Sequence, residues 1–311
     1  MQTLLRTALI ACLTLISYGA LATDLILHPT RIAPDVYAII GDLEGQSYAN
    51  DGFNSNLGFV VGSDGVLIIN SGPSTRVAQA LHAAIKKITS KPIQWLVNVN
   101  AQSHYWLGND YFRRLNIPIL AHGAASRRMQ EVGAGQLQSA QTLLKEKAAA
   151  TALAYPSETI GDSRILQLGK TKIALLHFGP AHTGGDLVVW LPESKILFAG
   201  DIVFTQRLLG VLPVGNSGGW VKAFDQAMGL KPRRVVPGHG QPTDIQTATR
   251  DTRDYLAYLR SAAQAVLASN GSLQDAVEKT DQSKFKYLLN FDLLAKRNMN
   301  QVFTEMEQES F

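Results

Sequence analysis

Apolar and polar positions along the first half of the chain predict short strands followed by helices. The turn Ser63-Asp64-Gly65 separates two of these strands, which indicates an antiparallel meander. The predicted strands are Asp35–Ile40, Leu57–Val61, Val66–Ile69, Ile93–Val97 and Ile117–Ala121. Helices are predicted over Thr75–Ile88, from about Trp106, and over Gln130–Ala154, which lacks proline and is rich in Ala, Gln, Leu and Lys.

The second half repeats this order, with strands first and helices second. The predicted strands are Arg164–Leu168, Lys172–His177, Asp186–Leu191, Lys195–Ala199 and Arg233–Val236, and the predicted helices are Gly218–Met228 and Ile245–Ala268. No linker rich in proline or serine separates the two halves. We therefore expect two sheets that face each other with helices outside them, an α/β (α+β) domain of four layers.

The tail from Leu273 onward is amphipathic and is predicted to be helical. We therefore divide the chain into a main domain over residues 23–270 and a C-terminal helical extension over residues 271–311. Within the main domain, Phe204–Trp220 is apolar and rich in glycine, with Arg207 as its only charge. This segment forms either a flap over a cleft or a loop docked on the tail helices.

Residues 1–22 have the pattern of a secretory signal peptide. Arg6 supplies a positive start, an apolar run extends from Thr7 to Ser17, and Ala20-Leu21-Ala22 offers small residues at a cleavage site. The apolar run is shorter than the ~20 residues that span a bilayer, which argues against a membrane anchor. We therefore expect a periplasmic or secreted protein with no stable membrane insertion after cleavage.

Composition narrows the chemistry of any site. The chain is 46% hydrophobic and 17% charged, which is typical of a globular protein with a substantial core. Its one cysteine, Cys12, lies within the predicted signal peptide, so the processed chain would have no thiol and any metal would be held by His, Asp or Glu. The formal charge of +4 comes from dispersed basic residues, which gives no support for a nucleic-acid partner.

Three histidines and one aspartate lie at the ends of predicted strands or in loops bounded by glycine. His104 lies in the loop after the strand Ile93–Val97, His182 lies in Gly-Pro-Ala-His-Thr-Gly-Gly-Asp, and His239 lies in Val-Pro-Gly-His-Gly. Asp201 ends the strand in Phe-Ala-Gly-Asp. A rigid scaffold can aim side chains at such positions into a common cleft.

The last three of these segments resemble, in order, spacing and flanking glycines, the later motifs of the metallo-β-lactamase superfamily. In that family these motifs supply a histidine, an aspartate and a closing histidine, which correspond here to His182, Asp201 and His239. The resemblance extends to about residue 260 and is greatest to periplasmic members found beside quinoprotein and sulfur-oxidation systems. It implies a four-layer αββα sandwich of two facing mixed sheets and a zinc-dependent hydrolase site.

The first metal motif of the family is altered in this chain. The family pattern is His-x-His-x-Asp-His followed by Gly-Asn, and Gly108-Asn109 fixes the register of the comparison. Asn100 and Gln102 then occupy the first two histidine positions, His104 occupies the aspartate position, and Tyr105 occupies the third histidine position. Amide oxygens are poor substitutes for imidazole toward zinc, so the resemblance implies that the first metal position is lost.

The second metal position of the family keeps a usable set of ligands. Two imidazoles and a carboxylate with a fourth position open are the ligand set of several catalytic zinc sites. The same ligand set suits ferrous iron, so zinc is favoured by the resemblance and not by the ligands themselves. We therefore expect one zinc ion, with iron or no metal as the alternatives. The candidate metal ligands are His104, His182, Asp201 and His239.

Two functions remain open. The first is a hydrolase in which one metal ion activates water against a small-molecule ester, amide or thioester, with Asp201 and His182 as catalytic residues and His182 as base or substrate contact. It predicts metal in the purified protein. The second is a catalytically inactive relative that binds a small periplasmic ligand or a partner protein in the same cleft. It predicts a metal-free fold whose stability is insensitive to chelators.

Overall fold

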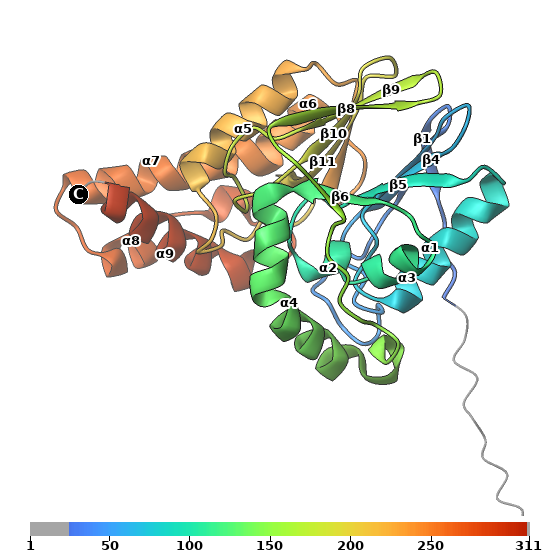
Figure 1. The fold of residues 1–311 in the computed structure, drawn as a ribbon. Coiled ribbons are helices and arrows are strands. Elements are labelled where there is room, and N and C mark those ends of the chain that lie inside the picture. Colours follow the sequence, from blue (N-terminus) through green and yellow to red (C-terminus); the bar gives the residue numbers. More distant parts are fainter. Residues whose placement is uncertain (1–24, 310–311) are drawn as a thin grey trace, which may run out of the picture.

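The computed structural model describes residues 25–309, so the predicted signal peptide and Cys12 lie outside the described residues. Two sheets face each other, and helices cover the outer side of each sheet (Figure 1). The predicted α/β fold of four layers is therefore confirmed. Among the described residues, no helix is both long and apolar enough to cross a membrane.

The first half of the chain forms a seven-stranded sheet whose strands lie in sequence order. Neighbouring strands are antiparallel from β1 to β4 and parallel from β4 to β7. These strands are β1 (Thr30–Ala33), β2 (Val36–Ile39), β3 (Leu57–Val61), β4 (Val66–Ile69), β5 (Ile93–Val97), β6 (Ile119–His122) and β7 (Glu158–Ile160). Its helices are α1 (Thr75–Ile88), α2 (Ser103–Trp106), α3 (Asn109–Arg114) and α4 (Gly123–Leu144), followed by the 3-10 helix η1 (Lys145–Ala148).

The second half forms a five-stranded sheet in the order β12-β11-β10-β9-β8. All neighbours are antiparallel except β11 and β12, which are parallel. These strands are β8 (Ser163–Leu168), β9 (Thr171–Leu176), β10 (Val188–Leu191), β11 (Ile196–Phe204) and β12 (Arg234–His239). The helices are α5 (Ser217–Gly229), α6 (Ile245–Ala248), α7 (Asp254–Ala268), α8 (Leu273–Lys279) and α9 (Phe291–Glu309), with a π-helical turn η2 (Thr249–Arg253) and a 3-10 turn η3 (Ser283–Phe285).

Separate apolar clusters hold the four layers together. Between the sheets, Val60 and Leu67 belong to the same buried cluster as Val189 and Phe198. The Phe198 ring also takes the space that a side chain at position 58 would need, because a Cβ added to Gly58 would lie 2.4 Å from the ring. Outside the first sheet, α1 contributes Val77, Leu81 and Ile85 to a second cluster with strand residues. The strands β3 and β4 are thus buried on both faces, which explains their apolar runs in the sequence.

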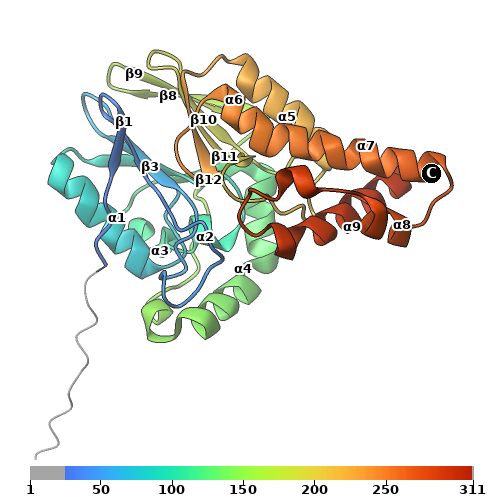
Figure 2. The ribbon, with the colours of Figure 1, turned by 180° about the vertical axis from the view of Figure 1, so that it is seen from behind.

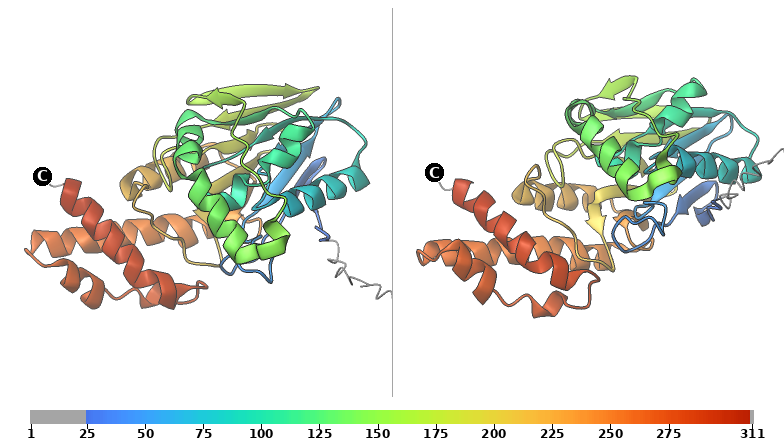
Figure 3. Two further views of the ribbon diagram at one scale, coloured as in Figure 1. Left: turned by 60° about the horizontal axis from the view of Figure 1, so that its bottom comes forward. Right: turned by 90° about the horizontal axis from the view of Figure 1, so that it is seen from below.

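The tail helices pack on the outer side of the second sheet. Val302 and Phe303 of α9 are buried in the same cluster as Phe224 of α5 and Leu256 of α7. Figure 2 and Figure 3 show that α7, α8 and α9 extend past the sheets on one side of the sandwich. The tail therefore contacts the main domain through apolar side chains and not through a polar surface alone.

The segment Phe204–Trp220 is docked on these tail helices, the second of the two arrangements that the sequence left open. The side chain of Asn298 in α9 donates to the carbonyl of Leu209 at 2.7 Å and accepts from the backbone N–H of Val211 at 2.9 Å. Leu209 itself is fully buried. A buried amide that pairs with two backbone groups fixes the path of the loop.

Two element boundaries differ from the sequence-based prediction. α4 begins at Gly123 and ends at Leu144, whereas Gln130–Ala154 was predicted, because His122 caps its start and Lys145 adopts a positive φ of 52° at its end. β11 continues to Phe204, so Asp201 lies within this strand and does not end it. The parallel partner β12 supports the extra length, with register shifts around Gly200. The short strands β1 and β7 were missed by the pattern analysis.

Candidate metal centre

Three candidate ligands converge between the two sheets. His104 lies in the first turn of α2, Asp201 within β11, and His239 at the end of β12. One donor atom from each lies within 4.8 Å of the others, and all three residues are buried. The strands β11 and β12 come this close at the site because Gly238 has no side chain: a Cβ there would lie 2.4 Å from Asp201 Oδ1.

The distances in this group fit a single cation. His239 Nε2 lies 3.4 Å from Asp201 Oδ1, and His104 Nε2 lies 3.9 Å from Asp201 Oδ2. Tetrahedral ligands with bonds of about 2.0–2.1 Å lie about 3.3–3.4 Å apart, so small side-chain movements would bring these donors onto one ion. Two nitrogens and one carboxylate oxygen are also chemically suited to zinc or ferrous iron.

The hydrogen bonding of the two imidazoles supports this fit. His104 Nε2 is buried and has no hydrogen-bond partner among residues 25–309. A buried imidazole nitrogen without a partner is uncommon, and a cation would provide one. His239 Nδ1 lies 2.6 Å from the carbonyl oxygen of Asn54 and donates to it, because a carbonyl can only accept. This bond directs the lone pair of His239 Nε2 toward Asp201, an arrangement common for histidine ligands.

Asp201 is held as an ionised carboxylate by its neighbours. Tyr105 donates its hydroxyl to Oδ1 at 2.7 Å, and the Asn100 amide donates to Oδ2 at 2.8 Å. Burial alone would raise the pKa of Asp201, but His182, His104 and His239 outweigh it and hold the pKa well below its usual range. Burial and the neighbouring Asp201 raise the pKa of Tyr105, so the phenol stays protonated and remains a donor.

His182 lies beside this group and is not among the three residues whose donor atoms all lie within 4.8 Å of one another. Its Nε2 is 3.7 Å from Asp201 Oδ2 and contacts the side-chain amide of Gln102. Burial lowers the pKa of His182 to about 4, so the ring is neutral at pH 7. The ring packs edge-on against Trp220 at a centroid distance of 4.8 Å, and Phe204 lies 5.6 Å away.

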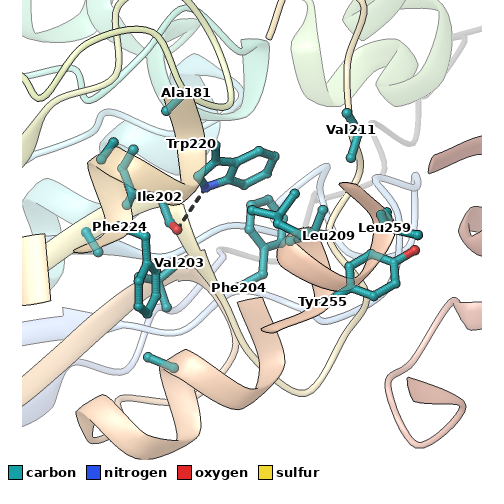
Figure 4. Packing of buried hydrophobic residues seen from close by; sticks show 14 of the residues in the cluster. Ala181, Ile202, Val203, Phe204, Leu209, Val211, Trp220, Phe224, Tyr255 and Leu259 are labelled. Carbon is teal, nitrogen blue, oxygen red and sulfur yellow. Dashed lines mark hydrogen bonds between the residues drawn. The ribbon is translucent and has the colours of Figure 1, made fainter. Parts of the chain in front are cut away.

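An apolar wall supports the histidines from the side of α5. Phe204 stacks on His239 with a centroid distance of 4.7 Å. Trp220 donates its indole N–H to the carbonyl of Ile202 at 3.0 Å, and Figure 4 shows this bond together with the packing of Phe204 beside it. These rings exclude water from one side of the centre and fix the orientation of the imidazoles.

Asn100 occupies the position between two buried carboxylates. Its side-chain nitrogen donates to Asp186 Oδ1 at 3.1 Å as well as to Asp201 Oδ2. Burial raises the pKa of Asp186 to about 7, although the Thr183 N–H donates to its Oδ2. Asp186 was not predicted as a site residue. The only signal in the sequence was its place at the end of the same glycine-rich segment that carries His182.

Comparisons with known proteins agree with this fold. The family model of the metallo-beta-lactamase superfamily matches residues 50–239. The chain is 36% identical over 105 residues to a type 2 metallo-beta-lactamase of Pseudomonas aeruginosa, a match that covers 33% of this chain and 42% of that protein. It is 31% identical over 106 residues to an acyl-coenzyme A thioesterase of Gallus gallus, which covers 33% of this chain and 38% of that protein. The matched part thus spans about two fifths of the length of these curated relatives.

The fold agrees with a solved structure over a longer stretch. A metallo-beta-lactamase from Pontibacter korlensis superposes with a TM-score of 0.62 at 20% sequence identity, and the match covers 74% of this chain and 99% of that one. At this identity the likeness shows the fold alone.

Proposed function

The chain belongs to the metallo-beta-lactamase superfamily, and from this premise we propose that it is an exported hydrolase-like protein with one metal ion held by His104, Asp201 and His239. The observation that carries the proposal is the convergence of their donor atoms within 4.8 Å in a buried site. The unpartnered Nε2 of His104 adds to it. Zinc is the metal that we propose, and ferrous iron is the alternative with the same ligand set.

The altered first motif is the reason that we propose one ion and not two. Asn100 and Gln102 offer amide groups where imidazoles would be needed. The Asn100 nitrogen is engaged by the carboxylates of Asp186 and Asp201, and its carbonyl accepts from the backbone N–H of Gln102 at 2.9 Å. His182 thereby loses the partners with which it would hold a first ion and becomes available for another role.

The residues around the ion would divide the work of hydrolysis. A bound zinc ion would lower the pKa of a water molecule and polarise the carbonyl under attack. Asp201 would orient the reacting groups through one oxygen while Tyr105 and Asn100 keep the carboxylate in place. With a pKa of about 4, His182 is a weak base at pH 7, which favours its role as a neutral hydrogen-bonding contact for the substrate over the role of general base.

The substrate that we propose is a small ester, amide or thioester. Support comes from two matched relatives, one described as a metallo-beta-lactamase and the other as an acyl-coenzyme A thioesterase. The fold alone does not choose among these bonds. We further propose that the chain acts in the periplasm or outside the cell, as do the members found beside quinoprotein and sulfur-oxidation systems. Intact mass of the exported protein would test this, because cleavage after Ala22 predicts a chain that begins at Thr23.

Elemental analysis tests the metal site directly. Wild type purified without added metal should contain about one ion per chain, whereas His104→Ala should contain little. His82→Ala is a matched control, because His82 pairs with Tyr111 at 2.8 Å away from the site. Equal absence of metal from wild type and His104→Ala would overturn the proposal.

One observation favours the second candidate, a catalytically inactive ligand-binding or partner-binding relative. Asn100 donates a hydrogen bond to one oxygen of Asp186 and to one oxygen of Asp201, so both carboxylates have a partner without any ion. Under this alternative a chelator leaves the melting temperature unchanged, whereas a bound metal stabilises the folded state by mass action.

A further inference from the structure

Three large apolar side chains lie exposed together where the chain passes from η3 into α9. Tyr287, Leu289 and Leu293 are 53%, 37% and 62% exposed. All three line the same depression of the surface, together with Leu43 from the loop between β2 and β3. We call the surface formed by Tyr287, Leu289 and Leu293 the apolar patch. Exposed apolar surface that is contiguous and has a polar rim marks a site of interaction with another protein or with a membrane.

The fold holds the apolar patch in this exposed position. The backbone N–H of Leu289 donates to the carbonyl of Gln206 at 2.9 Å, and the hydroxyl of Tyr287 donates to Asp251 Oδ1 at 2.9 Å. Leu288, which lies between the two exposed residues, is buried in the apolar cluster of the tail. The side chains of the patch are therefore exposed because of a fixed backbone conformation.

Basic side chains lie beside the apolar patch. Lys286 lines the same depression, and Lys296 and Arg297 follow Leu293 by three and four residues in α9, which places them on the same face of the helix. All three basic residues are exposed, and none forms an ion pair within residues 25–309. Asp292 is the one acidic residue from position 286 to position 297, so this stretch has a formal charge of +2.

This combination favours a lipid bilayer over a protein as the partner. Lysine is depleted in protein–protein interfaces relative to the rest of the surface. Segments that lie on a membrane instead combine leucine and aromatic side chains with lysine and arginine, and the basic residues are attracted to anionic lipids. The exposed leucines and the unpaired basic residues thus provide both of the interactions that peripheral membrane binding uses.

We infer that residues 286–297 form a peripheral membrane-binding surface, in which the apolar patch enters the interfacial region of a bilayer and Lys286, Lys296 and Arg297 contact anionic lipid headgroups. This inference goes beyond the proposed function and does not depend on a bound metal. The binding is reversible, because three side chains bury too little apolar surface for a stable anchor. The alternatives are a protein partner and a second copy of this chain.

The test is cosedimentation of the full processed chain with vesicles of equal parts phosphatidylglycerol and phosphatidylcholine, and with vesicles of phosphatidylcholine alone. Wild type should bind the anionic vesicles and should lose this binding as the salt concentration rises. Leu293→Ser should lower the partition coefficient about tenfold, because it removes a leucine from the apolar contact. The double variant Lys296→Gln/Arg297→Gln should lower it about fivefold for each charge removed. Lys296→Arg keeps the charge and should bind as wild type does.

Two control variants change the same residue types elsewhere on the surface. Leu115→Ser removes an exposed leucine at the end of α3, where Leu115 is 45% exposed. Lys86→Gln/Lys87→Gln removes two exposed charges from the last turn of α1. Both controls should bind anionic vesicles as wild type does, and circular dichroism verifies that every variant is folded.

Three results would overturn the inference. The first is the absence of binding to anionic vesicles. The second is binding that Leu293→Ser leaves unchanged or that the control variants weaken equally, because such binding would follow from overall charge. The third is a wild-type dimer in sedimentation velocity that Leu293→Ser dissociates while no vesicle binding is seen, which would assign the apolar patch to a second copy of the chain.

Discussion

The hydroxyl of Tyr105 donates to Asp201 Oδ1 at 2.7 Å, which joins the helix after β5 to the strand β11 at the centre of the site. Both groups are fully buried. Tyr105 thereby orients the carboxylate of a candidate metal ligand. Partners of this kind fix the geometry of ligands and tune their affinity for metal.

Tyr105→Phe should weaken metal binding while leaving all three ligands in place. Loss of an outer hydrogen bond to a ligand typically costs about 10–100-fold in metal affinity. Competition with a chromophoric chelator measures the dissociation constant for zinc. Tyr111→Phe is the matched control, because the Tyr111 hydroxyl pairs with His82 away from the centre. Equal zinc affinity of wild type and Tyr105→Phe would show that the Tyr105 hydroxyl does not support metal binding by Asp201.

His239→Ala should abolish metal-dependent stability. The variant loses an imidazole whose Nδ1 is fixed by the Asn54 carbonyl and whose Nε2 faces Asp201. A ligand at a thousandfold excess over its dissociation constant stabilises the folded state by about 4 kcal/mol. We therefore expect a chelator to lower the melting temperature of wild type by several degrees and to leave that of His239→Ala unchanged. If the chelator left the melting temperature of wild type unchanged, that result would contradict this prediction.

Much of the fold followed from the sequence because its signals are local. The strands Leu57–Val61, Val66–Ile69 and Ile93–Val97 were predicted with the bounds that the structure shows, since each is a buried apolar run between turn residues. β1 and β7 have only four and three residues, so their pairing depends on neighbours and not on their own pattern. Asp201 was placed at a strand end because glycine precedes it, but pairing with β12 carries the strand onward.

The candidate site could be predicted in part, because some of its sequence signals are also local. Glycine-flanked motifs identified His182, Asp201 and His239, and the structure places all three together with His104. Sequence reasoning could not find Asp186, because its importance comes from burial and from contacts with segments far away in the chain.

Asn100→Leu should destabilise the protein, and more strongly at alkaline pH. The substitution leaves Asp186 and Asp201 buried near each other without the amide that donates to both. Removal of a partner from buried charged groups costs about 2–5 kcal/mol. Urea unfolding of metal-free protein at pH 8.5 should show this loss, with a smaller loss at pH 5, where Asp186 is protonated. Identical losses at both pH values would show that the ionisation of Asp186 does not change the contribution of Asn100 to stability.

The raised pKa of Asp186 predicts a pH-dependent contribution to stability. Its folded pKa of about 7 lies above the ordinary value of 3.8 for an aspartate, so its contribution is fully present below pH 3.8 and is lost as pH rises through 7. The difference in unfolding free energy between wild type and Asp186→Asn should therefore fall from pH 5 to pH 8.5, by at least about 1 kcal/mol. His182 titrates in the opposite direction, but it is present in both proteins and cancels. A constant difference would contradict the raised pKa.

Asn298→Ala should release the loop between β11 and α5 from the tail. The side chain is the buried link to Leu209 and Val211, and it also donates to the Tyr255 hydroxyl at 3.1 Å. Two backbone groups would lose their partner, at a cost of about 2–4 kcal/mol. Limited proteolysis should then cut within residues 205–216 faster than in wild type, while Asn300→Ala, exposed on the same helix, should leave the rate unchanged. Equal cleavage rates for wild type and Asn298→Ala would mean that the loop holds its position by apolar packing alone.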